Sequence, residues 1–140
     1  MVRSLFEWRG DFCNEEVNVL HAEAFAHPVL EIDWLGQVKA HSLGWVTARD
    51  GGTLIGFVNL AWDGDAHAFI LDAMVLATRK GQGVGSELVA LAAKEARGAG
   101  CEWLHVDFED ALRPFYFAAC GFRPTAAGLI SLRKCPPARQ

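Results

Sequence analysis

Residues 80–86 read KGQGVGS, so three glycines fall within five residues. A mostly apolar stretch that predicts a strand precedes them, and a stretch with the period of an amphipathic helix follows them. Glycines let main-chain N–H groups converge, and the N-terminus of the following helix adds positive potential. Residues 80–86 are therefore predicted to form an anion site suited to a phosphate or pyrophosphate. A glycine-rich turn without a ligand is the alternative.

Two common phosphate-binding motifs do not fit this loop. A dinucleotide fingerprint, GxGxxG, would need a glycine where Ser86 or Leu88 stands. A Walker loop would need Gly-Lys followed by Ser or Thr, which the chain lacks. A nucleotide-phosphate enzyme that uses the loop is kept as an alternative, but no motif supplies the metal-binding carboxylates that it would need.

The hydrophobic pattern predicts an α/β fold with the order β-α-α-β-β-β-α-β-α-β. The turn sequence Asp50-Gly51-Gly52 is typical of a hairpin. Residues 66–108 are predicted to form a strand, loop, helix and strand, a crossover that usually makes its two strands parallel neighbours. We therefore expect a mixed sheet. The predicted strands cover residues 2–8, 43–48, 53–62, 66–77, 101–108 and 129–132, and the predicted helices begin near residues 11, 32, 84 and 111.

The chain has 140 residues, of which 51% are hydrophobic and 21% charged, as expected for one globular domain. Its net charge of -4 argues against non-specific nucleic-acid binding, which depends on a basic face. The longest segment without charged residues, Gly51 to Trp62, is shorter than the roughly 20 residues of a membrane span. The chain has no apolar leader near its start, so we expect a cytoplasmic protein with reduced thiols. It has no CxxC pair, so we expect no metal site.

Two segments resemble conserved motifs of one enzyme family. Residues 72–88, DAMVLATRKGQGVGSEL, are similar to motif A of the GNAT (Gcn5-related) N-acetyltransferases, and residues 115–122, FYFAACGF, resemble the family's FYxxxGF segment. One helix and one strand separate the two segments, as in the family. The resemblance implies a single acyltransferase domain over residues 1–140. It also implies the GNAT fold, a mixed, mostly antiparallel sheet of about six or seven strands with about four helices.

The resemblance implies acetyl-CoA as donor and CoA as product. The family binds the acyl-CoA pyrophosphate on loop amides, and pantetheine pairs like an extra strand with the preceding strand. Lys80 replaces the usual Arg or Gln, and Glu109 stands where many members have an Asn that contacts pantetheine. The residues that match the cofactor-binding positions are Met74, Val75, Leu76, Lys80, Gly81, Gln82, Gly83, Val84, Gly85 and Ser86.

Tyr116 matches the family tyrosine that protonates the departing thiolate. For the general base the sequence leaves several candidates. Asp72 stands in an otherwise apolar predicted strand, where a lone carboxylate is costly unless it faces water or a partner. His105 has the most suitable unperturbed pKa, about 6.5, although a strand histidine is more often structural. The predicted alternation puts Asp107 and Glu109 on the same strand face as His105, and His67 is a further candidate.

The acceptor is expected to be a primary amine of a small molecule or of a peptide or protein terminus. Trp34 and Trp62 lie where the family builds its acceptor pocket, although core packing explains most tryptophans equally well. No nucleic-acid or membrane partner is expected, and the resemblance allows a homodimer. A non-catalytic acyl-CoA-binding module is the alternative function.

Overall fold

The computed structural model describes residues 4–133 and contains two compact units, Met1–Val106 and Asp107–Gln140. The first unit is built on a five-stranded sheet in the order β1-β2-β3-β4-β5. Residues 2 and 3 of the predicted first strand lie outside the described residues. The elements of this unit are β1 (Leu5–Trp8), α1 (Asn14–Phe25), α2 (Trp34–His41), β2 (Ser42–Asp50), β3 (Thr53–Trp62), β4 (His67–Val75), the short helix η1 (Ala77–Arg79), α3 (Val84–Gly98) and β5 (Trp103–His105).

The sheet is mixed and mostly antiparallel, as predicted. Among the strands that residues 4–133 form, neighbours from β1 to β4 pair antiparallel, and only β4 and β5 pair parallel. Gly51 and Gly52 connect β2 to β3 with φ values of 58° and 87°. Positive φ at both central residues is typical of the tight turn that suits the twist of a hairpin, and glycine adopts it without steric cost.

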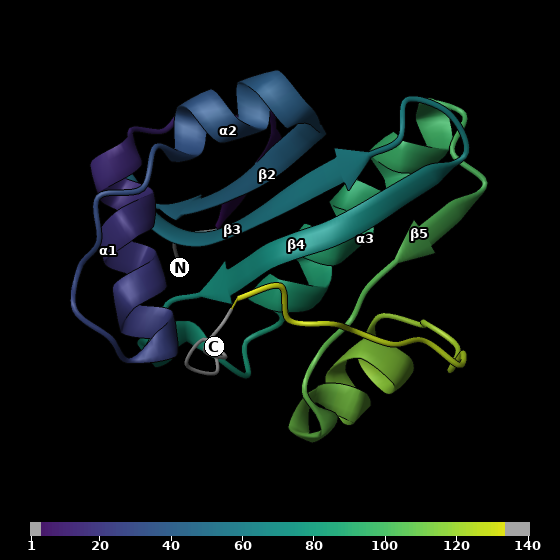
Figure 1. Cartoon of the computed structure of the whole chain (residues 1–140). Coiled ribbons are helices and arrows are strands. Elements are labelled where there is room, and N and C mark those ends of the chain that lie inside the picture. Colours follow the sequence, from purple (N-terminus) through teal and green to yellow (C-terminus); the bar gives the residue numbers. More distant parts are fainter. Residues whose placement is uncertain (1–3, 134–140) are drawn as a thin grey trace. The chain divides into compact units, whose positions relative to one another are not determined.

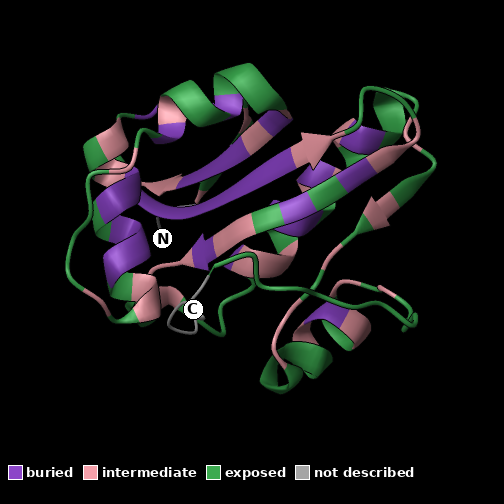
Figure 2. Cartoon of the chain, viewed as in Figure 1, coloured by how far each residue is buried: buried purple, intermediate pink, exposed green. Residues whose placement is uncertain are grey.

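Helices cover both faces of the sheet. Helices α1 and α2 pack on one face and α3 on the other (Figure 1). Strand β3 lies between them and is buried over most of its length (Figure 2). At Gly56 a Cβ atom would lie 3.0 Å from side-chain atoms of both Val84 and Leu88, so this glycine lets α3 approach the sheet closely. The core between the sheet and α1 and α2 contains Phe12, Val17, Leu20, Trp34, Val38, Leu54, Phe57 and Met74.

An ion pair ties the first turn of α1 to β2. The Glu16 carboxylate accepts two hydrogen bonds from the Arg49 guanidinium, at 2.6 and 2.9 Å. It also accepts one from the backbone N–H of Cys13, which closes the start of the helix. The bonds from Arg49 are the main reason why the pKa of Glu16 falls from 4.5 to about 2.

Replacing Glu16 by glutamine is expected to lower the free energy of unfolding at neutral pH by about 1 kcal/mol, because the pair is partly exposed and screened by water. The lowered pKa in the folded state means that the ion pair stabilises fully above the ordinary pKa of 4.5 and is lost as the pH falls toward about 2. Urea unfolding across this pH range checks the prediction. Parent and variant should converge in acid, and an equal difference at all pH values would contradict this explanation.

The second unit contains two short helical segments, η2 (Asp110–Leu112) and the π-helix η3 (Pro114–Ala119). The single helix expected near residue 111 is therefore split in two. The predicted last strand, 129–132, is wrong: these residues pair with no strand in the described part of the chain, and Leu129, Ile130 and Leu132 are 83%, 82% and 96% exposed. An apolar run indicates a strand only where a neighbouring strand accepts its hydrogen bonds. The described residues therefore form five strands, fewer than the six or seven expected.

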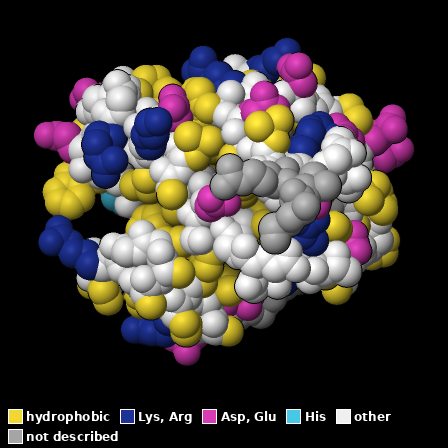
Figure 3. Space-filling view, turned by 180° about the vertical axis from the view of Figure 1, so that it is seen from behind, with side chains coloured by type: hydrophobic (Ala, Val, Ile, Leu, Met, Phe, Trp, Pro, Cys, Tyr) yellow, Lys and Arg dark blue, Asp and Glu magenta, His cyan; other side chains and the backbone are white. Residues whose placement is uncertain are grey.

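Charged side chains of both signs are interspersed on the face seen in Figure 3. Among residues 4–133, no helix is both long enough and apolar enough to cross a bilayer.

Candidate functional site

The glycine loop joins η1 to the start of α3. Gly81 and Gly83 have φ values of 80° and 85°, a conformation that residues with a side chain rarely adopt. Residues 80–83 are exposed. The α-helical hydrogen bond of the first turn joins Glu87 N–H to the Gly83 carbonyl at 3.1 Å. The N–H groups of residues 84–86 precede it and have no acceptor inside the helix, so they can bind an anion.

Side chains brace this loop from two sides. The Arg79 guanidinium forms an ion pair with Asp50 at 2.6 Å and donates a second hydrogen bond to the Gln82 side chain at 3.0 Å. The Ser86 hydroxyl donates to the Gly83 carbonyl at 3.1 Å. The role of Arg79 could not be read from the sequence, because its partner Asp50 is the last residue of β2 and lies far away in the chain. These contacts hold the loop in place while its main chain stays accessible.

Strand β4 has an open edge next to the loop. Its parallel pairing with β5 covers only the segment from His67 to Phe69, whereas its pairing with β3 continues to Val75. Beyond Phe69 the main chain of β4 therefore pairs with β3 on one side, and no described strand pairs with it on the other side. An extended ligand can add to such an edge as an extra strand.

The three positions predicted to pair with the cofactor, Met74, Val75 and Leu76, differ in their main-chain hydrogen bonds. The N–H of Leu76 donates to Ile55 at 2.8 Å, and its carbonyl accepts from Arg79 at 2.8 Å. Met74 lies opposite Phe57 of β3, and Val75 lies opposite Gly56. Because the N–H of Leu76 bonds to β3 and neighbouring residues of a strand point their polar groups to opposite sides, those of Val75 point to the open edge. Among these three positions, Val75 best fits a ligand that lies along β4.

Asp72 lies in a bulge of β4. Met74 pairs with Phe57 and Leu71 pairs with Asn59, so two residues of β4 face one residue of β3. Asp72 adopts φ 54°, which aspartate tolerates better than most residues. The Asn59 amide donates a hydrogen bond to its carboxylate at 3.3 Å and accepts one from Ser42. The half-buried Asp72 therefore has a buried polar partner on the neighbouring strand.

Burial raises the pKa of Asp72 above 3.8, and the bond from Asn59 and the charge of His21 oppose this effect. A raised pKa makes the carboxylate a stronger base near neutral pH. Neither Asn59 nor His21 was identified from the sequence. A signal existed for Asn59, which is a lone amide in the apolar run of β3, but not for its distance to Asp72.

His105 lies at the end of β5 with different partners. It forms a 2.7 Å hydrogen bond with His67, and its ring stacks on Phe69 with the ring centres 4.7 Å apart. Strand β5 ends at His105, three residues before the predicted end. Asp107 and Glu109 lie beyond it in the second unit, so strand alternation does not group them with His105.

Tyr116 lies in η3 and is 6% exposed. Its ring stacks on Phe108 with the ring centres 4.6 Å apart and meets Phe115 and Phe122 edge to face. Burial is the main reason why the pKa of Tyr116 rises to about 12, and Cys120 and Asp107 add to it. The phenol therefore carries its proton at neutral pH, as a proton donor must.

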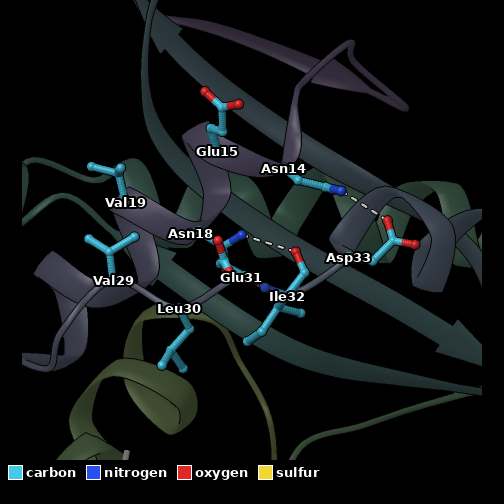
Figure 4. A pocket seen from close by; sticks show the side chains of 9 residues that line it. All are labelled: Asn14, Glu15, Asn18, Val19, Val29, Leu30, Glu31, Ile32 and Asp33. Carbon is cyan, nitrogen blue, oxygen red and sulfur yellow. Dashed lines mark hydrogen bonds between the residues drawn. The ribbon is translucent and has the colours of Figure 1, made fainter.

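Trp34 belongs to the core rather than to a pocket. It is 3% exposed, and its indole N–H donates to Asn18 at 2.9 Å. A cavity of about 560 Å³ lies between α1 and the segment before α2 (Figure 4). The Asn14 and Asn18 side chains in its wall bond to Asp33 and Ile32 and so hold this segment against α1. Neither the glycine loop nor β4 lines this cavity.

Residues 2–122 match the acetyltransferase (GNAT) family. The chain belongs to the GNAT acetyltransferase family. No curated protein sequence matches the chain.

Solved structures show that the fold is that of other GNAT proteins. A GNAT family acetyltransferase from Streptococcus pneumoniae superposes with a TM-score of 0.72 at 24% identity, covering 94% of this chain and 99% of that one. An aminoglycoside N-acetyltransferase solved in complex with CoA gives a TM-score of 0.74 at 18% identity, covering 96% and 97%. Glucosamine-6-phosphate N-acetyltransferase from Arabidopsis thaliana gives 0.73 at 12%, covering 91% and 97%.

Proposed function

We propose that residues 1–140 act as one acyltransferase domain that transfers an acetyl group from acetyl-CoA directly to a primary amine. The observation that carries this proposal is the sequence of three features along β4 and α3. The bulge at Asp72, the open main chain at Val75 and the N–H groups of residues 84–86, which have no acceptor inside the helix, follow one another along the chain. A base, a strand-like binding edge and an anion site thus lie in the order that an acyl-CoA thioester requires.

The residues of this region fit acetyl-CoA. The free N–H groups at the start of α3 suit the pyrophosphate, with the exposed Lys80 adding positive charge. The open edge at Val75 suits the amide-containing pantetheine arm. When bound, acetyl-CoA supplies an activated acetyl group as a thioester.

The transfer requires two proton movements. The amine nitrogen forms a bond to the acetyl carbon in place of the carbon–sulfur bond, so the nitrogen loses one proton and the sulfur gains one. Asp72 is proposed to accept the first proton, because its half-buried carboxylate has a raised pKa. His105 stays as the second candidate for this role. The role of Tyr116 as donor of the second proton is supported by the matched motif and by its protonated state.

The acceptor proposed is a primary amine of a small molecule or of a peptide or protein terminus. Two similar structures are N-acetyltransferases of an aminoglycoside and of glucosamine 6-phosphate, which are both small amines. The net charge of -4 favours the approach of a cationic amine.

Thermal unfolding tests the binding part of this proposal. Acetyl-CoA at 100 times its dissociation constant should stabilise the chain by about 2.7 kcal/mol, which raises the melting temperature by several degrees. ATP serves as the control and should give no comparable shift. An equal response to ATP, or no response to acetyl-CoA at millimolar concentration, would contradict the proposed donor site.

Turnover tests the catalytic part. Release of free thiol from acetyl-CoA should follow the addition of an accepted amine from a panel of an aminoglycoside, glucosamine 6-phosphate, a polyamine and a peptide with a free N-terminus. Tyr116→Phe should lower kcat by about 100-fold and leave acetyl-CoA binding intact. Binding without turnover of any amine would favour a non-catalytic acyl-CoA-binding module instead.

A further inference from the structure

Two large apolar side chains are exposed in the first half of β4. Phe69 and Leu71 are 37% and 39% exposed, although the alternate residues Ala68 and Ile70 are 0% and 3% exposed (Figure 2). One face of this segment is thus packed in the core, and the other face is open to solvent. Single exposed apolar residues need no explanation, but a contiguous exposed apolar patch marks a binding site.

The strand register shows on which side of the sheet this open face lies. Phe57 of β3 packs against Trp34 of α2, with the ring centres 6.2 Å apart. Side chains two residues apart in a strand point to the same face, so Asn59 is on this side as well. Leu71 lies opposite Asn59, and Phe69 is two residues before Leu71. Both apolar side chains therefore point to the side of α1 and α2, beyond the part of the sheet that these helices cover (Figure 1).

Two histidines extend the patch onto β5. His105 lies opposite Phe69 in the parallel pairing, and its ring stacks on the Phe69 ring with 4.7 Å between the centres and 18° between the planes. His67 forms a 2.7 Å hydrogen bond with His105, and this bond holds the two imidazoles together. We call the surface formed by His67, Phe69, Leu71 and His105 the aromatic shelf. Its flat rings suit a ligand that is itself a flat ring.

The aromatic shelf ends where the proposed reaction centre begins. The pairing of β4 with β5 stops at Phe69 and His105 in the described part of the chain, so the edge proposed for the pantetheine arm opens directly beyond them. Leu71 directly precedes Asp72 in the chain. Asn59, which lies opposite Leu71, donates a hydrogen bond to the Asp72 carboxylate at 3.3 Å. A ligand on the shelf therefore has this carboxylate at one end.

We infer that the aromatic shelf binds the acceptor, and that this acceptor is a primary amine joined to an aromatic ring by a short alkyl spacer. The inference rests on the proposed function. The negative charge of Asp72 is complementary to the ammonium group of such an amine. Its ring lies on Phe69 and His105, where stacking and the burial of apolar surface stabilise it. Three residues of extended strand, about 10 Å, separate Phe69 from Asp72, so a short spacer is sufficient.

Binding to the aromatic shelf can be tested without turnover. NMR of the full chain with isotope-labelled histidine follows His67 and His105 while phenethylamine is added at constant pH. Both rings are expected to change their chemical shifts, because a stacked ring alters the local magnetic field. Ethylamine, which has the same amino group and no ring, should give no comparable change. His41, an exposed residue at the end of α2, is the internal reference.

Two outcomes of this titration would overturn the inference. One is that phenethylamine at millimolar concentration leaves His67 and His105 unchanged. The other is that their signals change with protein concentration before any amine is added, because a second copy of the chain then covers the aromatic shelf.

Turnover tests whether the aromatic shelf selects the acceptor. The parent should acetylate phenethylamine with a kcat/KM about tenfold higher than that for ethylamine. Phe69→Ser should lower kcat/KM about tenfold for phenethylamine and leave the value for ethylamine nearly unchanged. Phe69→Tyr, which keeps the ring, should keep the preference. Equal losses for both amines in Phe69→Ser would indicate a structural role and overturn the inference.

Leu71 and Leu5 provide a matched pair for the same measurement. Leu5 is also an exposed leucine in a strand, but it lies on β1 at the opposite edge of the sheet. Leu71→Ser should lower kcat/KM for phenethylamine and not for ethylamine, whereas Leu5→Ser should change neither value. This pair keeps the test decisive if Phe69→Ser does not fold. The inference is overturned if the two leucine variants behave alike.

The inference and the proposed function fail in different ways. If the parent acetylates no amine, the proposed function is contradicted, and the NMR titration separately supports or overturns the aromatic shelf as a binding site. If the parent acetylates only amines without an aromatic ring, the proposed function stands and the inference is overturned.

Discussion

Replacing Asp72 by asparagine is expected to lower kcat/KM about 100- to 10,000-fold while making the protein more stable at neutral pH. The loss follows from the role proposed for Asp72, since an amide cannot accept the proton of the amine. Asparagine has nearly the same shape, tolerates the positive φ of this position and can still accept the hydrogen bond from Asn59. The variant should therefore keep the bulge. Steady-state turnover with an accepted amine measures the effect.

The gain in stability follows from burial. Because the pKa of Asp72 is raised in the folded state, its stabilising contribution is complete below 3.8 and is lost as the pH rises through the higher, folded-state pKa. At neutral pH the ionised carboxylate thus costs free energy, and its removal should raise the free energy of unfolding. This difference should disappear below the ordinary pKa.

The control for Asp72→Asn is Asp65→Asn, the same chemical change at an exposed turn between β3 and β4. It should alter neither turnover nor stability. Full activity of Asp72→Asn would exclude this carboxylate as the base and make His105 the next candidate to test.

Replacing Gly83 by valine is expected to abolish the stabilisation by acetyl-CoA. Gly83 precedes α3 at φ 85°, where a β-branched side chain costs about 1–2 kcal/mol. Relief of this strain must move the main chain that aims the N–H groups of residues 84–86. Thermal unfolding with and without acetyl-CoA measures the loss of binding.

Gly64 offers a matched control for this substitution. It has nearly the same φ, 84°, and at both glycines a Cβ atom would meet no other atom within 4 Å. Gly64→Val should thus lose similar stability but keep its response to acetyl-CoA. If both variants respond alike, the loop is not the donor site.

Much of the fold follows from local sequence. Strand β3 has the predicted bounds, because its apolar run lies between two turns that contain glycine. Helix α3 follows from the spacing of its apolar residues, which face the sheet. The glycine loop stands where the strand pattern changes to the helical one. In each case residues that are close in the chain determine the structure. They set the main-chain conformation and decide which face of the element is apolar.

Bonds between distant residues could not be read from the sequence. The 129–132 run looks like a strand, yet it pairs with none. In the bulge, two residues of β4 lie opposite one residue of β3, and this depends on the register between the two strands. The same register places Asn59 beside Asp72. His21 and His27 look like two ordinary polar residues until the end of α1 brings their rings together.

The sequence by itself determined the order of most elements, the glycine loop and the family resemblance, since all of these depend on residues that are close in the chain. Only the tertiary structure decided which polar groups meet inside the protein. Burial and the pairing of β3 with β4 raise the pKa of Asp72, and the packing of α1 on the sheet brings His21 under the influence of its charge. The chemistry of these groups depends on neighbours that lie far away in sequence.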